Sequence, residues 1–325
     1  MSQPTAGTAS TVTVSTGDGM TVTITSGGAI TVTPPAAPPP PPAGTPATIF
    51  FDDFTGPKNS APGSGTWLVN GVAGPNNWGI ATGRDVTSST NQYVDLASNV
   101  YMDGDSHLVI ATTAGTNGYG TNSGRIATWD DGGYNSGGSK FTATWGTFSA
   151  SIKCTPTAGY WPAFWAYGAI AAWPAGGEID CLENFGTGYS APLDQVSGGI
   201  HGGTGAGNNE RSLAGGYYTI ADGNFHTYSW TIPEDYSSIT FQVDGVNMAV
   251  SGYNPITKAD WVSYATQGGG GGPVVGATGA DWPFGPDFPY GIVLNVSTKA
   301  GGVNPASPGS TVNVLVVDWV KVTQP

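Results

Sequence analysis

The stretch TVNVLVVDWVKV (residues 311–322) carries the alternation that indicates the fold class. On a strand, Leu315, Val317 and Trp319 share one face, and the even-numbered valines from 312 to 316 share the other. Both faces are apolar, which is typical of a strand that is covered on both sides. We therefore predict that this segment lies inside a protein with two packed layers of sheet.

Other segments show the same period of two. FTATWGTFSASIK (141–153) alternates, and ITFQV (239–243), Asp244-Gly245 and VNMAV (246–250) predict a hairpin with a two-residue turn. Glycine fills 52 and proline 25 of the 325 positions, so almost every window is interrupted, which disfavours a helical bundle. The sequence predicts an all-β fold, with many short strands in a two-sheet sandwich.

Composition excludes several classes of protein. Aromatic residues make up 11% and charged residues only 10%, which is not the composition of a disordered chain. The net charge of −13 argues against nucleic acid as a partner, because phosphate binding requires a cationic surface. The longest uncharged aromatic stretch, 161–177, contains two prolines and is shorter than the roughly 20 residues of a membrane span. We therefore expect no membrane span.

Histidine and cysteine are scarce. Three histidines and two cysteines are too few and too scattered for a zinc framework. Cys154 and Cys181 either pair in an oxidising compartment or remain as two small buried residues.

Three regions follow one another along the chain. Residues 1–33 form a Thr/Val-rich tract with strand-like alternation, and residues 34–46 form a proline-rich linker that is stiff and extended. The globular domain is predicted to occupy residues 47–325. The first ten residues, MSQPTAGTAS, have neither a basic start nor an apolar core, so no signal peptide is visible.

Two of the four glutamates in the chain lie in one short apolar segment, Glu178-Ile179-Asp180-Cys181-Leu182-Glu183. On a regular strand Glu178 and Asp180 share a face and Glu183 points the other way. A β-bulge around Cys181-Leu182 would return Glu183 to their face. The Cα atoms of the two glutamates would then be about 13 Å apart. Side chains that lean together would leave roughly 5 Å between the carboxyl groups, the separation of a retaining glycosidase.

Such a pattern in isolation also fits a solvated edge strand or a calcium or magnesium site. The surroundings favour sugar binding, because aromatic residues precede the carboxylates. They are the segment Tyr160-Trp161-Pro162-Ala163-Phe164-Trp165-Ala166-Tyr167 and, between it and Glu178, Trp173. Pyranose rings stack on aromatic faces while their hydroxyl groups bind polar groups. We predict that Trp161, Trp165 and Trp173 contact substrate, and that Phe164 belongs to the core.

The residues also resemble a known family. WPAFWAYG, a loop and then WPAGGEIDCLEN resemble the signature region of the family 16 glycoside hydrolases, in its bulged form, and FDDFTG (51–56) resembles the family's opening segment. Further segments follow in the family's order, so the resemblance covers nearly the whole domain: 100–110, 123–126, 225–232, 241–245, 293–296 and 317–322. The bulged subgroup is similar to laminarinases, which cut β-1,3-glucans internally.

The resemblance implies a concanavalin-like β-sandwich jelly roll with a concave substrate cleft, and a catalytic domain at residues 47–325. It assigns Glu178 as the nucleophile, which must be ionised, and Asp180 as the residue that tunes the charge of the nucleophile. It assigns Glu183 as the acid/base, and nearby negative charge would raise the pKa of Glu183.

The resemblance also implies further sites. Asn91, Arg125 and Asn295 match positions that bind sugar hydroxyls, although turn and strand-end hydrogen bonding would explain them equally well. His201 falls where laminarinases often carry a substrate-site histidine near the acid/base, although a lone histidine in a glycine-rich turn needs no such role. Asp318, with the region of Asp53 and Gly104, matches a structural calcium site on the convex face. No cofactor is expected to take part in catalysis.

Three functions therefore remain in competition. The first is a retaining endo-β-1,3-glucanase that acts outside the cell or at a surface, and the second is a relative that cuts mixed-linkage glucan or a galactan. The third is a non-catalytic glycan-binding protein, because a jelly roll alone does not define a function. We expect a monomer. The N-terminal tract could tether it to a larger assembly, including a virion.

Overall fold

The chain forms two compact units, Met1–Thr45 and Pro46–Pro325, each of which is described by itself. The computed structural model describes residues 11–15, 21–25, 30–33, 46–62, 67–69, 72–73, 78–129, 140–171, 173–186, 192–203, 209–212, 218–219, 222–248, 254–261, 282–298 and 312–325.

The first unit contains a three-stranded antiparallel sheet of β1 (Thr11–Ser15), β2 (Thr21–Thr25) and β3 (Ile30–Thr33). The register sets apolar positions opposite apolar positions, as in Val12 opposite Ile24 and Ile24 opposite Ile30. The Thr/Val alternation of the sequence thus forms strands, as predicted. The segments GDG (17–19) and SGG (26–28), whose composition predicts the turns between these strands, lie outside the described residues.

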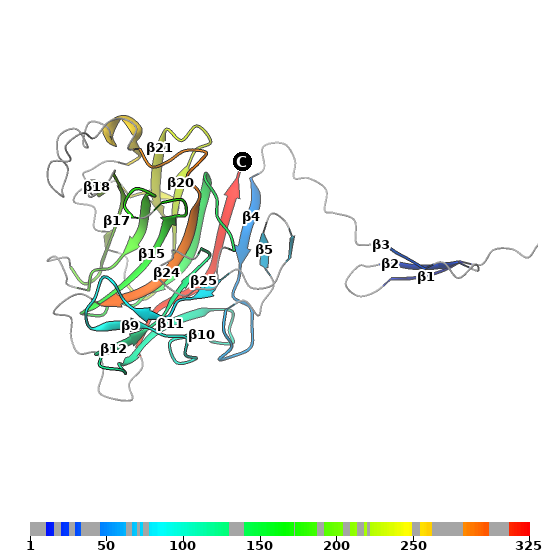
Figure 1. Ribbon diagram of the computed structural model, residues 1–325, viewed down its shortest axis with the longest axis horizontal. Helices are drawn as coiled ribbons and strands as arrows, with labels where there is room; N and C mark the ends of the chain where they lie inside the picture. The colour runs from blue at the N-terminus through cyan, green and yellow to red at the C-terminus, as the bar shows by residue number, and fades with distance from the viewer. Residues whose placement is uncertain are drawn as a thin grey trace, which may run out of the picture. The chain divides into compact units, whose positions relative to one another are not determined.

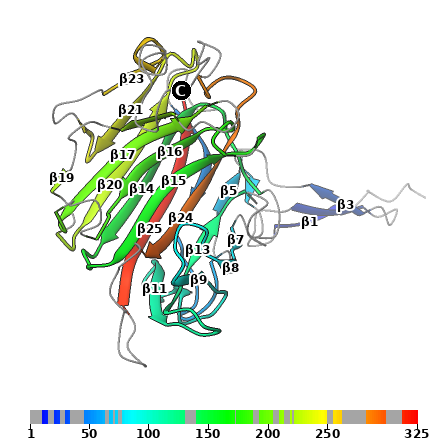
Figure 2. The same ribbon diagram turned by 60° about the vertical axis from the view of Figure 1, so that its left-hand side comes forward.

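The second unit is built from two stacked sheets (Figures 1 and 2). The larger has 14 strands, and its central order is β22-β21-β20-β14-β25-β11-β12-β9-β8. Its strands are β4 (Ala47–Asp52), β5 (Trp67–Val69), β6 (Val72–Ala73), β8 (Gly83–Arg84), β9 (Asn91–Tyr93), β10 (Val100–Met102), β11 (Leu108–Ala114), β12 (Thr121–Ser123), β14 (Gly146–Cys154), β20 (Phe225–Ile232), β21 (Ser238–Val243), β22 (Val246–Asn247), β23 (Ile256–Thr257) and β25 (Val312–Gln324).

The smaller sheet has eight strands in the order β18-β17-β16-β15-β24-β13-β7, with β19 paired to β17. Its strands are β7 (Gly79–Ile80), β13 (Arg125–Ala127), β15 (Tyr160–Gly168), β16 (Glu178–Glu183), β17 (Gln195–Gly202), β18 (Asn209–Ser212), β19 (Tyr218–Thr219) and β24 (Tyr290–Thr298). The helical residues in the described chain are the single turn 258–261. No helix among the described residues is long and apolar enough to cross a membrane.

The main hydrophobic core joins the two sheets. Trp230 of β20 stacks on Phe148 of β14, with ring centroids 4.9 Å apart, and also meets Phe164 of β15 at 4.9 Å. All three rings are fully buried. Phe164 is therefore a core residue, as predicted. Because β15 turns this residue inward, its neighbours Trp161, Trp165 and Tyr167 are left partly exposed on the opposite face.

Cys154 and Cys181 are both free and buried. Burial raises the pKa of the Cys154 thiol to about 12. Of the two alternatives, the structure thus has two small buried thiols rather than a disulfide.

The expectation for β25 needs a correction. Leu315 and Val317 are buried in the main core as predicted, but Trp319 is partly exposed and Val320 takes the next core position. The register against β14 shifts between Val317 and Trp319, so Asp318 is an extra residue in the strand. Beyond this bulge the even-numbered residues face the core instead of the odd-numbered ones. A prediction based on a regular two-residue period misses this change.

The other strand predictions hold with two changes of boundary. The hairpin strand predicted at 246–250 ends at Asn247 in β22, and residues 249–250 lie outside the described ones. Asp244 and Gly245 form the turn between β21 and β22 with φ values of 51° and 74°, as a two-residue hairpin turn requires. The segment predicted at 141–153 becomes a strand only at Gly146, where β14 begins. Residue 143 is instead joined to Tyr290 by an isolated bridge.

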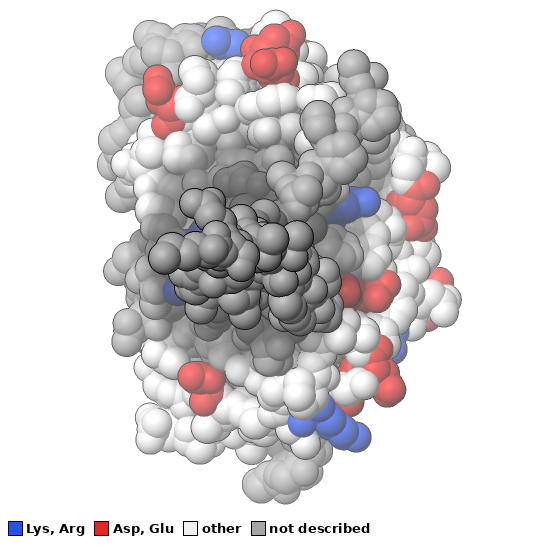
Figure 3. Space-filling model, turned by 90° about the vertical axis from the view of Figure 1, so that its right-hand side faces the viewer, with Lys and Arg blue, Asp and Glu red and all other residues white. Residues whose placement is uncertain are grey.

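The excess of acidic over basic residues in the sequence is visible on the surface of the protein. On the face shown in Figure 3, Asp and Glu form several separate groups, and Lys and Arg are fewer. The chain carries 22 acidic and 9 basic residues, so this face reflects the composition.

Candidate active site

A bulge in β16 places three carboxylates on one face. Against β15, Glu178 lies opposite Tyr167, Asp180 opposite Trp165 and Glu183 opposite Ala163. Tyr167 and Ala163 are four residues apart, whereas the two glutamates are five apart. The register against β17 shifts in the same place, between Asp180 and Glu183. The bulge predicted around Cys181-Leu182 is confirmed.

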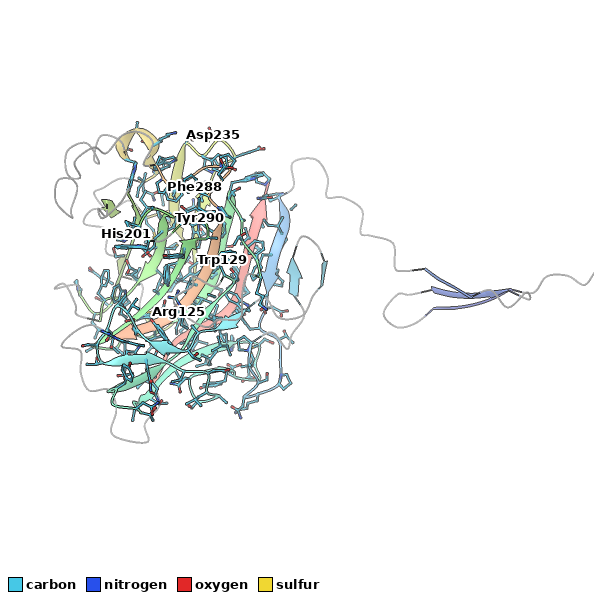
Figure 4. The ribbon with its side chains drawn as sticks, viewed as in Figure 1. Arg125, Trp129, His201, Asp235, Phe288 and Tyr290 are labelled. Carbon is cyan, nitrogen blue, oxygen red and sulfur yellow. The ribbon has the colours of Figure 1, made fainter. Side chains whose placement is uncertain are left out.

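The register extends this face across the sheet in rows. One row joins Glu178 to His201 of β17, and another joins Glu183 through Ala163 to Asn295 of β24 and Arg125 of β13. Figure 4 shows His201 and Arg125 at different heights on the unit, which agrees with their different rows. We call the surface formed by these rows the carboxylate face.

Glu178, Asp180 and His201 form a compact group. Their potential ligand atoms all lie within 4.8 Å of one another, and His201 Nε2 is 3.2 Å from Asp180 Oδ2. Burial, followed by the charge of Asp180, raises the pKa of Glu178 to about 8. A hydrogen bond with Asp180 also raises this pKa, while His201 and a hydrogen bond from Trp173 lower it. Burial and the neighbouring carboxylate thus favour the protonated form of Glu178 in the substrate-free molecule, whereas attack on a sugar requires its ionised form.

Glu183, the last residue of β16, lies among aromatic groups. Trp161 Nε1 donates a hydrogen bond of 3.0 Å to Glu183 Oε1. The Trp161 ring also packs against Phe185, with centroids 5.3 Å apart. This packing and hydrogen bond fix the Glu183 carboxyl group at the N–H edge of the Trp161 indole.

Arg125, Trp165 and Asn295 form a second connected group. The Arg125 guanidinium carbon lies 4.9 Å from the Trp165 ring centroid. Asn295 accepts a hydrogen bond of 2.6 Å from Trp165 Nε1 and donates one of 3.1 Å to the Tyr93 hydroxyl. Tyr93 was not predicted, and only the fold brings it beside Asn295, 202 residues away along the chain.

Asn91 is placed differently from the expectation that it binds sugar. Its side chain is fully buried and donates a hydrogen bond of 3.0 Å to Asp85 Oδ2. Asp85, also fully buried, further accepts hydrogen bonds from Ser297 Oγ and from the amide and hydroxyl groups of Thr87. In this structure Asn91 thus belongs to a buried polar network that ties the loop 85–91 to the end of β24.

Trp173 is the most open aromatic ring of the group, at 46% exposed. It lies 6.1 Å from the His201 ring, and its backbone amide donates to the Tyr167 hydroxyl at 2.9 Å. Tyr167 itself is partly exposed beside Glu178 and was not among the predicted substrate-binding residues. The alternation of β15 with Trp165 could have identified it.

The predicted calcium residues lie on neighbouring elements. Asp53 follows β4, and Thr55 Oγ1 lies 3.4 Å from Ser106 Oγ, beside Gly104. β25, with its bulge at Asp318, pairs with β4 at Val320 and with β11 at Val317. Two carboxylates and a backbone carbonyl are oxygen donors that suit calcium, so these residues fit the ion by their chemistry.

The chain is similar to known proteins in sequence and in fold. A sequence profile described as glycosyl hydrolases family 16 matches residues 93–261. The chain therefore belongs to glycosyl hydrolase family 16.

One characterised relative is a beta-glucanase of Rhodothermus marinus, which is 30% identical over 198 residues. That match covers 56% of this chain and 58% of the relative, so the chain spans less than two thirds of it.

Solved structures show the same fold at low identity. An endo-1,3-beta-glucanase of Streptomyces sioyaensis has a TM-score of 0.58 at 24% identity, covering 88% of this chain and 98% of that one. A second is described as an immunostimulatory antigen and pseudo beta-1,3-glucanase of Mycobacterium tuberculosis. It has a TM-score of 0.56 at 23% identity, covering 86% of this chain and 99% of that one. These likenesses confirm the jelly-roll sandwich.

Proposed function

We propose that the protein is a retaining endo-acting hydrolase of β-1,3-glucans. The observation that carries this proposal is the β16 bulge, because it puts Glu178, Asp180 and Glu183 on one face among partly exposed aromatic rings. The beta-glucanase relative and the glucanase named among the structural neighbours support the substrate class.

The reaction would proceed by double displacement. Glu178 attacks the anomeric carbon while Glu183 gives its proton to the departing glycosidic oxygen. Water then attacks the glycosyl-enzyme bond, Glu183 takes up a proton from it, and Glu178 is released.

The hydrogen bond between Glu178 and Asp180 fits this scheme. Attack requires an ionised and oriented Glu178, and the contact with Asp180 holds the Glu178 carboxyl group in place. Asp180 would therefore act as a positioning residue for the nucleophile.

A panel of linkage-defined glucans tests the substrate. We expect β-1,3-glucan to be cut internally to oligosaccharides, faster than mixed-linkage glucan or galactan. Faster cleavage of mixed-linkage glucan or galactan would show that β-1,3-glucan is not the preferred substrate, while the protein would still be a glycoside hydrolase. Binding of β-1,3-glucan without any product would favour the glycan-binding alternative.

Proton NMR of the first products tests the mechanism. Two displacements at one carbon retain configuration, so the β-anomer should appear first. Initial appearance of the α-anomer from a β-glucan would exclude a glycosyl-enzyme intermediate.

We further propose that the protein works outside the cell or at a surface as a monomer, since its polymeric substrate would be met there. The Thr/Val-rich tract would then attach it to a larger assembly. Fractionation with an antibody against residues 47–325 and light scattering of the full chain would examine location and oligomeric state.

A further inference from the structure

We propose that Glu178, Asp180 and His201 form a binding site for a divalent cation of the zinc type. They are the only cluster of three or more potential metal-ligating side chains found within the described ranges. The site uses two neighbouring strands, since Glu178 and Asp180 alternate on β16 and His201 is the register partner of Glu178 on β17.

A second observation concerns Asp180. Its side chain is 4% exposed, and its Oδ2 atom is buried without a hydrogen-bond partner of good geometry. That oxygen lies 3.2 Å from His201 Nε2. A buried carboxylate oxygen without a well-aligned hydrogen bond is costly, and a cation between Asp180 and His201 would satisfy it.

The donor set selects the class of ion. One imidazole nitrogen and two carboxylate oxygens suit zinc, whereas calcium and magnesium prefer oxygen donors alone. Tetrahedral bonds of about 2 Å set ligand atoms about 3.4 Å apart, so the group would contract from its present spread. Glu178 and His201 are partly exposed and are the two side chains that can move.

Three protein ligands leave a coordination position open to water. If the proposed hydrolase function holds, zinc would bind the attacking carboxylate and inhibit the enzyme reversibly. Zinc binding involves only these three side chains and does not require activity.

The chain supplies a matched control in His226. This histidine also contacts two carboxylates, but Asp244 lies 2.7 Å from its Nδ1 atom and Asp222 lies 3.1 Å from its Nε2 atom. The carboxylates sit at opposite ring nitrogens, so one ion cannot bind all three groups as it can at His201.

Calorimetry of the full chain with zinc chloride, in buffer containing calcium, tests the site. We expect one zinc ion to bind per chain. H201N and D180N should each weaken that binding at least about tenfold, while H226Q should leave it unchanged. Cobalt(II) titration provides a second readout, because ligand-field bands should appear in the native chain and be lost in H201N.

Absence of zinc binding to the native chain would overturn the proposal, as would loss of binding in H226Q but not in H201N or D180N. Circular dichroism identifies any variant that fails to fold, in which case the other variant decides. Inhibition is measured separately: zinc should slow glucan hydrolysis by native and H226Q protein, and a chelator selective for zinc should restore it. If the protein binds zinc but the zinc-free protein does not hydrolyse glucan, the proposed function is refuted and the metal site is still supported.

Discussion

Glu178 and Asp180 illustrate how a single residue's environment shapes the chemistry of the site. Both belong to one strand and share one face, so burial and the charge of Asp180 raise the pKa of Glu178. Glu183 lies beyond the bulge and instead receives the Trp161 hydrogen bond. The two glutamates thus have different surroundings, as two different catalytic roles require.

E178Q should abolish hydrolysis while leaving glucan binding intact. The substitution removes the attacking oxygen but retains Trp161, Trp165 and Trp173, so the rate should fall by several orders of magnitude. Reducing-sugar release and affinity electrophoresis on laminarin measure the two properties. E234Q is the control, because Glu234 is exposed in the turn between β20 and β21 and should keep full activity. Normal turnover by E178Q would place the chemistry elsewhere.

D85A should destabilise the protein. The change leaves the buried Asn91 amide and the buried Ser297 hydroxyl without their acceptor on Asp85. The free energy of unfolding should fall by about 3 kcal/mol, since each unsatisfied buried group costs about 1–3 kcal/mol. Urea denaturation measures this, with D95N at an exposed position as control. Equal stability of the two variants would show that the network is dispensable.

At the scale of elements, two bulges determine which side chains face where. The extra residue Cys181 in β16 brings Glu183 to the carboxylate face, and the extra residue Asp318 in β25 turns Trp319 away from the core. The β16 bulge could be inferred from the sequence, because only a bulge brings Glu183 to the same face as Glu178 and Asp180. The second could not, because Trp319 fits an apolar face as well as Val320 does, and only the pairing with β14 distinguishes them.

The hairpin of β21 and β22 is tied to β20 by His226, which contacts Asp222 and Asp244. Burial lowers the pKa of His226, but the two carboxylates more than offset it, and the net pKa is raised. Protonated His226 therefore stabilises the folded state fully below the unfolded pKa of about 6.5, and this contribution is lost as pH rises through the folded pKa.

H226Q should consequently lower the melting temperature near about pH 5.5, and the difference from the native chain should shrink toward about pH 9. Calorimetric scans across this range measure the difference. H107Q is a useful comparison, because His107 contacts a single carboxylate, Asp103. A difference that grows with rising pH would contradict the assignment.

At the scale of the molecule, residues 1–46 should be dispensable for hydrolysis. The tract contains Asp18 as its one charged residue and has no aromatic residue, so it offers neither catalytic groups nor stacking surfaces. Residues 1–45 also form a separate compact unit. A chain starting at Ala47 should keep its specific activity on soluble laminarin while losing attachment to a larger assembly. Loss of activity in a folded truncated chain would mean that the tract contributes to the site.

Calcium should stabilise the second unit without taking part in the reaction. An ion that binds only the folded state raises its stability by mass action, so EDTA should lower the melting temperature and added calcium should restore it. D318N should weaken this response. A melting temperature unaffected by EDTA and by calcium would argue against the site at Asp53, Gly104 and Asp318.

The sequence alone determined the two-layer β architecture, the β16 bulge and the core position of Phe164. These follow from local alternation, because a strand's period of two reports which side chains share a face. Tertiary structure decided which strands are neighbours and in what register: His201 opposite Glu178, Tyr93 beside Asn295, and Asp85 beneath Asn91. These contacts depend on closure of long loops between strands, and no local pattern in the chain records the partner that each strand will meet.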